Sequence, residues 1–160
     1  MKIINLVSPI LGTNCYLIIF NTKAIIIDPS VEYDLILKNL DDCKLEGIFL
    51  THGHADHFSF LEDIYKHEKV NLYMHENAKE KLINSYKNGS ELFNYPLTFN
   101  DLEKVIEVDD NQIIEIDGCL IKVITTPGHT NCSVCYLIEN HLFSGDTLFY
   151  RTVGRTDLYS

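Results

Sequence analysis

The stretch that decides the fold of this sequence reads Thr51-His52-Gly53-His54-Ala55-Asp56-His57. It follows the apolar run Gly47–Leu50, which predicts a short buried strand. The stretch holds three of the chain's seven histidines and one carboxylate. Imidazole nitrogens and carboxylate oxygens are the ligands that zinc and similar divalent ions favour. The sequence therefore predicts a metal site at a strand end, in preference to a polar turn whose histidines cluster by chance.

The spacing within this loop indicates two sets of ligands. His52 and His54 are two residues apart and can converge on one ion, and Gly53 keeps the gap between them small. Asp56 and His57 are adjacent, so their side chains diverge toward a second ion or toward the water bound to the first. Asp56 is also the candidate catalytic group, because its carboxylate could orient that water and accept its proton.

Two later segments each place one potential ligand after a predicted strand. A Pro-Gly pair predicts a sharp turn that brings His129 to the end of a strand at Leu120–Thr125. Asp146 follows a strand expected at His141–Phe143. Alone, His129 is more typical of a loop residue and Asp146 of a turn or helix cap. Their order after the histidine-rich loop, each at a strand end, favours one shared metal site.

The remaining pattern predicts a mixed α/β fold in a single domain over residues 1–160. Apolar residues at helical spacing predict a helix at Tyr33–Leu40. Short turns such as Asp117-Gly118 dominate, which disfavours a wholly parallel sheet and favours two sheets with helices packed outside. Strands are expected at Lys2–Leu6, Asn14–Phe20, Lys23–Ile27, Gly47–Leu50, Asn71–Met74, Lys104–Val108, Gln112–Ile116, Leu120–Thr125, Ser133–Glu139 and His141–Phe143. Further helices are expected near Phe58–His67 and at Glu76–Lys87, before an irregular segment over 88–103 that could cover a cleft.

These motifs resemble those of the metallo-β-lactamase superfamily. The loop 51–57 looks like its Thr-His-x-His-x-Asp-His motif. Thr126–Thr130 is similar to its Thr-Pro-Gly-His-Thr turn, and Gly145–Phe149 to its Gly-Asp-Thr-Leu-Phe segment. Gly12–Ile18 and Gly154–Asp157 resemble the glyoxalase II (hydroxyacylglutathione hydrolase) branch. The resemblance implies an αββα sandwich with a metal site at one edge, between the sheets.

The resemblance also implies a role for each candidate ligand. Such families hold one ion with three histidines, hold a second with an Asp-His pair, and bridge the two with one carboxylate. The corresponding residues here are His52, His54 and His129 for the first ion, Asp56 and His57 for the second, and Asp146 for the bridge. We expect one or two divalent ions, zinc first, with iron and manganese as the other candidates.

The family pattern continues beyond the position of Ser160 with a further strand, an outer helix and a Pro-Gly-His that supplies the last ligand of the second metal. We therefore expect the sandwich to lack its final strand and helix here, with a full first site and a weaker second one. The strands near Leu120–Phe149 are then expected to leave an open edge, which favours self-association into a homo-oligomer.

The resemblance and the metal chemistry together predict a hydrolase of the hydroxyacylglutathione or related thioester type, in which metal-bound hydroxide attacks a carbonyl. A persulfide dioxygenase-like oxidoreductase is the alternative, because its single iron is bound by residues like His52, His129 and Asp146. A metal-binding form without turnover is the third. Metal identity and oxygen consumption separate the first two, and any turnover excludes the third.

Composition favours a small-molecule substrate. The net charge of −10, with only 13 Lys and Arg, disfavours nucleic acid. No apolar run has the length of a membrane span. The odd count of five cysteines, mostly inside apolar runs, predicts reduced thiols in a cytoplasmic protein. The charged run Lys79-Glu80-Lys81 is interpreted as solvated helix surface, and Cys132 and Cys135 as packing residues on opposite faces of a strand. The other histidines, His67, His75 and His141, are interpreted as non-ligands. Arg155 and Asp157 are interpreted as an ion pair or an anion contact.

Overall fold

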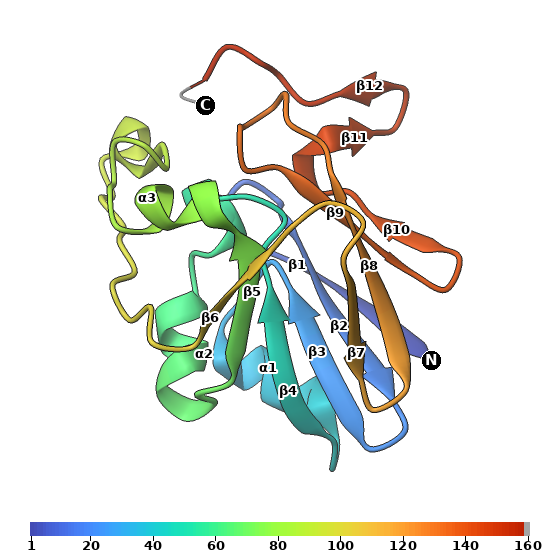
Figure 1. Cartoon of the computed structure of the whole chain (residues 1–160). Coiled ribbons are helices and arrows are strands. Elements are labelled where there is room, and N and C mark those ends of the chain that lie inside the picture. Colours follow the sequence, from blue (N-terminus) through green and yellow to red (C-terminus); the bar gives the residue numbers. More distant parts are fainter. Residues whose placement is uncertain (159–160) are drawn as a thin grey trace.

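The protein is described here by a computed structural model that covers residues 1–158. Two β-sheets pack face to face, and the α-helices cover the outer face of the larger sheet (Figure 1). This confirms the predicted mixed α/β architecture of two sheets with helices outside. Within residues 1–158 no helix lies on the outer face of the second sheet, and none is long and apolar enough to cross a membrane.

The larger sheet has six strands in the order β1-β2-β3-β4-β5-β6. The first three are joined by antiparallel hairpins, and β3 to β6 run parallel. Because parallel strands point the same way, the carboxyl ends of β3, β4 and β5 meet at one edge, the upper one in Figure 1. The strands are β1 (Lys2–Val7), β2 (Asn14–Phe20), β3 (Lys23–Ile27), β4 (Lys44–Phe49), β5 (Asn71–His75) and β6 (Val105–Val108).

The second sheet is antiparallel, in the order β10-β9-β8-β7. Its strands are β7 (Ile113–Ile116), β8 (Cys119–Thr125), β9 (Val134–Ile138) and β10 (His141–Phe143). Asp117 and Gly118 join β7 to β8 with φ of 50° and 81°, the left-handed pair that a tight hairpin requires. β7 and β10 are its edges, and self-association there stays a prediction. A small ribbon follows, made of β11 (Leu148–Phe149) and β12 (Thr152–Val153).

Alternation along the central strands divides the core into two layers. On β2, Cys15, Leu17 and Ile19 pack toward the helices, whereas Ile18 and Phe20 pack toward the second sheet. Successive side chains of a strand point to opposite faces, so an unbroken apolar run suits a strand that is buried on both sides. The layer between the sheets therefore fixes how the loops of one sheet meet those of the other.

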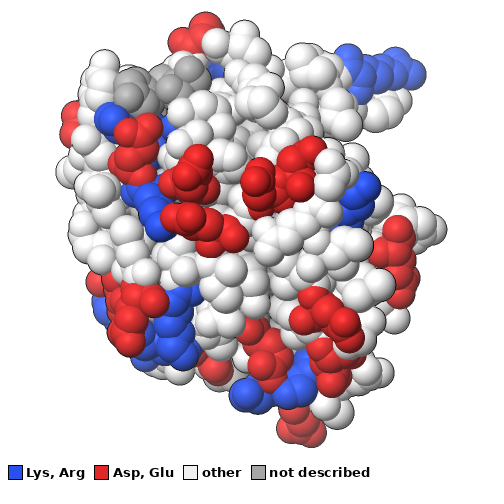
Figure 2. Space-filling view, viewed as in Figure 1, with Lys and Arg blue, Asp and Glu red and all other residues white. Residues whose placement is uncertain are grey.

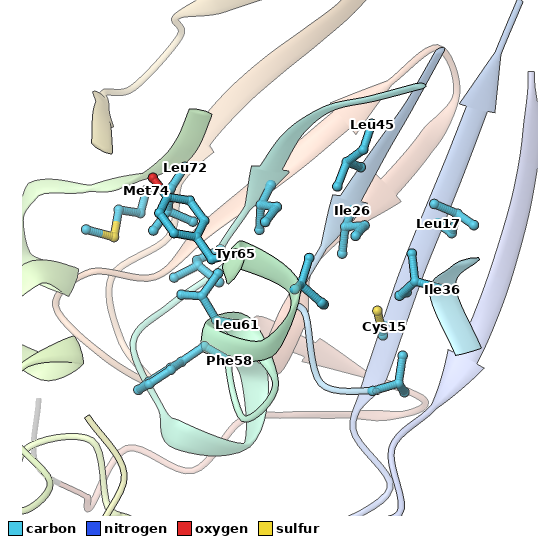
Figure 3. Packing of buried hydrophobic residues seen from close by; sticks show 14 of the residues in the cluster. Cys15, Leu17, Ile26, Ile36, Leu45, Phe58, Leu61, Tyr65, Leu72 and Met74 are labelled. Atoms are coloured by element: carbon cyan, nitrogen blue, oxygen red, sulfur yellow. The ribbon is translucent and has the colours of Figure 1, made fainter. Parts of the chain in front are cut away.

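The helices bury their apolar sides on the larger sheet (Figure 3). Ile36 comes from α1 (Tyr33–Leu40), and Leu61 and Tyr65 come from α2 (Leu61–His67). The confirmed helix at 33–40 has the bounds that its apolar spacing predicts. α2 begins later than the expected Phe58, because residues 55–57 form a separate 3₁₀ turn.

The single helix predicted at Glu76–Lys87 is wrong. The chain forms a 3₁₀ turn at Glu76–Ala78 and a short α3 at Lys79–Leu82. After this helix, the side-chain oxygen of Asn84 accepts hydrogen bonds from the backbone amides of residues 86 and 87, at 3.1 Å each. These side-chain bonds replace the backbone bonds that would continue the helix, so the helix does not extend to Lys87. Asn88 then donates from its side chain to the carbonyls of Lys81 and Leu97 and ties the following loop down.

The interpretation of Lys81 as solvated surface is also wrong, because its side chain is fully buried. The aliphatic stem packs on Gly53, where an added Cβ would lie 2.7 Å from the Lys81 Cβ. The ammonium donates to Asn131 Oδ1 at 2.6 Å. Lys81 thus connects the histidine-rich loop to the loop after β8.

The two cysteines predicted to be packing residues are both buried, but only Cys135 lies in a strand. Cys132 belongs to the turn before β9 and packs into the layer under the helices. Cys135 lies between Thr126 Oγ1 at 3.5 Å and the carbonyl of Ser144 at 3.8 Å. The two thiols have different neighbours, because Cys132 Sγ lies 3.2 Å from Thr130 Oγ1, but the predicted reason, alternation along one strand, is wrong since Cys132 lies in the turn.

Candidate metal centre

The predicted ligands meet at one edge of the sandwich, because three strand ends converge there. The histidine-rich loop follows β4, and its last three residues form the 3₁₀ turn η1 (Ala55–His57). His129 follows β8, and Asp146 lies in the 3₁₀ turn η4 (Gly145–Thr147) after β10. The second sheet is held to the loop by a backbone hydrogen bond from Val134 to Thr51 at 2.8 Å.

Three buried imidazoles form the centre of the site. His54 Nδ1 lies 3.1 Å from His52 Nε2 and 3.0 Å from His129 Nε2. Ligand nitrogens around a tetrahedral zinc ion lie about 3.3 Å apart, given Zn–N bonds of about 2.0–2.1 Å. The three side chains form a possible ion-binding group, all of them buried. The separations and the chemistry of the donors fit a divalent cation.

The protons on two of these rings are fixed by their other nitrogens. His129 Nδ1 lies 2.7 Å from the Arg155 carbonyl, which can only accept, so Nδ1 carries the proton. His52 Nδ1 lies 3.1 Å from Thr51 Oγ1, whose own proton goes to Asp28 Oδ2 at 2.7 Å. Both rings therefore present unprotonated Nε2 atoms to His54. A single proton on His54 Nδ1 could satisfy only one of them, whereas a cation satisfies all three.

A second possible ion-binding group shares His52 with the first and adds His57 and Asp146, with Asp56 beside them. His57 Nε2 is 3.2 Å from Asp146 Oδ1 and 3.5 Å from Asp56 Oδ2. Asp146 Oδ2 in turn lies 3.4 Å from His129 Nε2, so this carboxylate reaches both groups. His57 Nε2 is buried without a hydrogen bond that satisfies it, as expected of a nitrogen that is meant for a metal. The geometry thus brings all six predicted residues together.

Asp28 positions both halves of the site, and the sequence interpretation missed it. Its carboxylate accepts from the Thr51 amide at 2.8 Å, from the Thr51 hydroxyl, and from His57 Nδ1 at 2.8 Å. It is buried and adopts a left-handed backbone, with φ of 55°. Carboxylates of this kind fix the ring orientation of metal-ligating histidines. The only local signal was an aspartate before a proline at the end of β3.

Close packing of backbone segments holds the loops together around these ligands. Gly145 has φ of +47°, and a Cβ there would overlap the Thr51 side chain. Gly154 lies so close to the Asp146 carbonyl that a Cβ would overlap it, and would lie 3.1 Å from His129 Nδ1. The segment after β12 therefore forms one wall of the site. The Gly-Arg-Thr-Asp stretch therefore packs against Asp146 and His129, a role that the sequence interpretation did not assign to it.

Burial sets the charge of two histidines of the site, and neighbouring groups outweigh burial at His57 and Asp146. Burial lowers the pKa of His52 well below its ordinary value, and lowers that of His54 to about 4. These rings are neutral at physiological pH and offer lone pairs. Burial also opposes the charged form of His57, but the neighbouring carboxylates, Asp28 above all, outweigh it and raise the pKa of His57. Burial would raise the pKa of Asp146, but the neighbouring imidazoles, His57 at 3.2 Å above all, outweigh it and lower this pKa.

A cleft of about 480 Å³ opens above the ligands. Its floor includes His54, Asp56, His129 and Asp146, so a molecule in the cleft would contact both groups of ligands. Its rim is apolar and exposed, with Leu11, Leu92, Phe93, Phe149 and Val153 around the mouth. The segment over 88–103, predicted to be irregular and able to cover a cleft, contributes Leu92 and Phe93 to this rim, but these two residues lie in a 3₁₀ turn at Ser90–Phe93.

The sequence profile of the metallo-β-lactamase superfamily matches residues 9–160. The chain belongs to this superfamily. Over 144 residues it is 35% identical to the probable polyketide biosynthesis zinc-dependent hydrolase BaeB of Bacillus velezensis, covering 88% of this chain and 57% of that protein. It is 32% identical over 150 residues to the probable metallo-hydrolase YqgX of Bacillus subtilis, covering 91% of this chain and 70% of that protein.

A solved superfamily member has the same fold over nearly the whole chain. The crystal structure of the B3 metallo-β-lactamase BLEG-1 matches with a TM-score of 0.89 at 28% identity, covering 98% of this chain and 78% of that one. The chain spans 57% and 70% of the length of the two curated relatives. These comparisons confirm the superfamily and its fold, and they do not single out the glyoxalase II branch.

Asp146→Asn tests whether this carboxylate holds metal or only caps a turn. A cap would tolerate the change, because asparagine caps about as well as aspartate. A carboxylate between two metal-binding groups would not, and we expect metal affinity to fall by at least about tenfold. The measurement is metal bound per chain at fixed free zinc. Asp117→Asn, at the β7–β8 turn, is the control, and equal metal content in the two variants would argue against a ligand role.

Proposed function

We propose that this superfamily member is a metal-dependent hydrolase of the thioester type, with zinc as the first candidate ion. The observation that carries the proposal is the convergence of three buried imidazole nitrogens at 3.0 and 3.1 Å, two of them held unprotonated by outer partners. The relative BaeB, a probable polyketide biosynthesis zinc-dependent hydrolase, supports the choice of zinc and of hydrolysis.

In this proposal His52, His54 and His129 hold one ion, and His57 with Asp56 and Asp146 holds a second. A bound divalent ion lowers the pKa of a bound water toward about 7 and polarises a carbonyl oxygen. Since Asp146 lies within 3.4 Å of the first group and 3.2 Å of His57, it suits a bridging position.

Asp56 is proposed as the residue that orients the attacking water and accepts its proton. Its Oδ2 receives a hydrogen bond from Thr13 Oγ1 at 2.6 Å, which fixes the carboxylate on the side facing the cleft. A thiolate leaves readily, because the pKa of a simple thiol is about 8.5. No separate general acid is therefore required on the leaving-group side of the cleft.

The persulfide dioxygenase-like alternative uses His52, His129 and Asp146 around one iron. The 3.4 Å separation of His129 Nε2 and Asp146 Oδ2 is compatible with such a set. The position of His54 Nδ1 between the other two histidines favours a three-histidine site instead. A metal-binding form without turnover remains the third proposal.

The experiment that tests the function strips the protein with a chelator and reloads it with zinc, iron or manganese. Thiol release from a simple acyl thioester and oxygen uptake are then measured on the same samples. We expect thiol release that vanishes on stripping, returns with zinc and consumes no oxygen. Oxygen uptake that requires iron would favour the dioxygenase, and binding of every metal without turnover would favour the third proposal.

A further inference from the structure

We infer that the substrate carries an uncharged apolar acyl arm that lies in a side pocket of the metal cleft. The pocket has a volume of about 250 Å³, and its apolar walls are Ile10, Leu11, Ala55, Phe93, Tyr95 and Leu97. The inference rests on the proposed hydrolytic function and names the class of substrate for that site.

The side pocket is continuous with the cleft. Leu11, Asp56, Asn88 and Phe93 line both, so Asp56 marks the junction between the pocket and the metal ligands. A carbonyl placed beside Asp56 can therefore extend one substituent into the side pocket while its sulfur side stays in the open cleft. The arm that enters the pocket is then the acyl chain.

Several apolar side chains that form the walls of the pocket remain largely exposed to solvent. Phe93 and Tyr95 are 60% and 67% exposed, and Leu11 opposite them is 63% exposed. Large apolar side chains grouped around a hollow mark a ligand-binding or interaction site. An apolar chain bound between them would remove their surfaces from water, which is the favourable term in its binding.

Two of the polar residues of the pocket, Asn88 and Ser90, are engaged within the protein, whereas the Ser59 hydroxyl is buried without a hydrogen-bond partner among the described residues. Asn88 donates to two backbone carbonyls, and its oxygen accepts from the Ser90 amide at 3.0 Å. The Ser90 hydroxyl accepts from the Leu97 amide at 2.9 Å. The Ala55 amide also donates to the Asn88 carbonyl at 3.0 Å, which fixes this wall to the histidine-rich loop. This wall of the pocket is therefore preformed, and besides Asp56 at the junction the Ser59 hydroxyl is the polar group that the described lining leaves unpaired.

The charges around the site disfavour an anionic arm such as that of glutathione. Of the described residues that line the cleft, the side pocket and the adjoining hollow at His57, Arg155 is the one Lys or Arg. Its guanidinium already makes hydrogen bonds of 2.6 and 2.9 Å to Asp157. A free carboxylate would have to displace Asp157 and approach Asp56 and Asp146. In the view of Figure 2, Lys and Arg side chains lie in separate groups and form no continuous basic patch.

The test is a series of N-acetylcysteamine thioesters with acetyl, butyryl, hexanoyl and octanoyl chains, hydrolysed by the zinc-loaded protein. We expect kcat/KM to rise about fourfold for each methylene that is buried, until the pocket is filled. Phe93→Ala and Tyr95→Ala should flatten this dependence. Ile113→Ala, an exposed residue of β7 that lines none of these hollows, is the matched control and should keep it. Thermal unfolding of each variant confirms that it is folded.

A binding measurement separates this inference from the proposed function. The thioether analogues of the same series cannot be hydrolysed, and their affinity for the zinc-loaded protein is measured by calorimetry. Affinity that rises with chain length, and falls in Phe93→Ala, supports the apolar arm even if no thioester is turned over. Hydrolysis with no dependence on chain length, or faster hydrolysis of S-lactoylglutathione than of every acyl chain, would overturn the apolar arm and leave the hydrolase standing.

Discussion

His54→Ala is expected to empty the three-histidine group and to abolish metal-dependent hydrolysis. His54 Nδ1 is the central nitrogen, 3.1 Å from His52 Nε2 and 3.0 Å from His129 Nε2, so its loss leaves two ligands that no longer enclose an ion. Changes to outer partners of a metal ligand already cost about 10–100-fold in affinity. Loss of the ligand itself should cost more than about a hundredfold.

The measurement is zinc, iron and manganese per chain after dialysis at fixed free metal, followed by thiol release. His141→Ala is the matched control, because His141 is exposed on β10 and takes no part in the site. It should keep both metal and activity. If His54→Ala binds as much metal as the control, the three-histidine assignment fails.

The parts of the fold that the sequence predicted well are those with local signals. β2 and β3 are unbroken apolar runs between short turns, and their observed bounds match the expected ones. The histidine-rich loop follows a buried strand, which is where a rigid scaffold can hold ligands. Its three imidazoles and Asp56 are therefore found together at the edge of the sandwich.

The outer partners of the ligands were not predictable in the same way. Asp28 contacts Thr51 and His57 across 23 and 29 residues of sequence, and His129 donates to the carbonyl of Arg155, 26 residues away. These contacts depend on how the loops meet, and a carbonyl can accept a proton whatever its side chain. No residue pattern in either segment could identify them.

Lys81 illustrates the opposite error, in which a local pattern was misleading. The charged neighbours of Lys81 predicted a solvated helix. The observed helix is short, ends after Leu82, and packs the lysine side chain against Gly53. The absence of a side chain at Gly53 makes room for the lysine stem, and Asn131 accepts from its ammonium. A buried lysine is tolerated when its charge has a partner, and that partner lies 50 residues away.

The apolar side pocket also depends on tertiary structure. Its walls come from the β1–β2 loop, the η1 turn and the irregular segment around Phe93, which are distant in sequence. The segment 88–103 has no periodic pattern, so its aromatic residues gave no sign of which way they face. The internal hydrogen bonds of Asn88 and Ser90 fix it, and they follow from the shape of the loop.

Asp56→Asn is expected to lower thioester hydrolysis by about 10²–10⁴-fold, the range that a positioned general base contributes. Asparagine keeps the size of the side chain but cannot accept the proton of the attacking water. Thr13→Val removes the hydroxyl that donates to Asp56 Oδ2 at 2.6 Å and should give a smaller loss, because the carboxylate remains but is less well held. Thr22→Val, in the exposed β2–β3 turn, is the matched control.

Metal content measured on each sample separates the two proposed roles of Asp56. If Asp56 acts as a base, Asp56→Asn loses turnover while the zinc of the three-histidine group stays bound, and Thr13→Val lies between it and the wild type. If Asp56 serves only to hold the second ion, excess zinc should restore turnover to Asp56→Asn. Turnover equal to that of Thr22→Val at every zinc concentration would remove Asp56 from the mechanism.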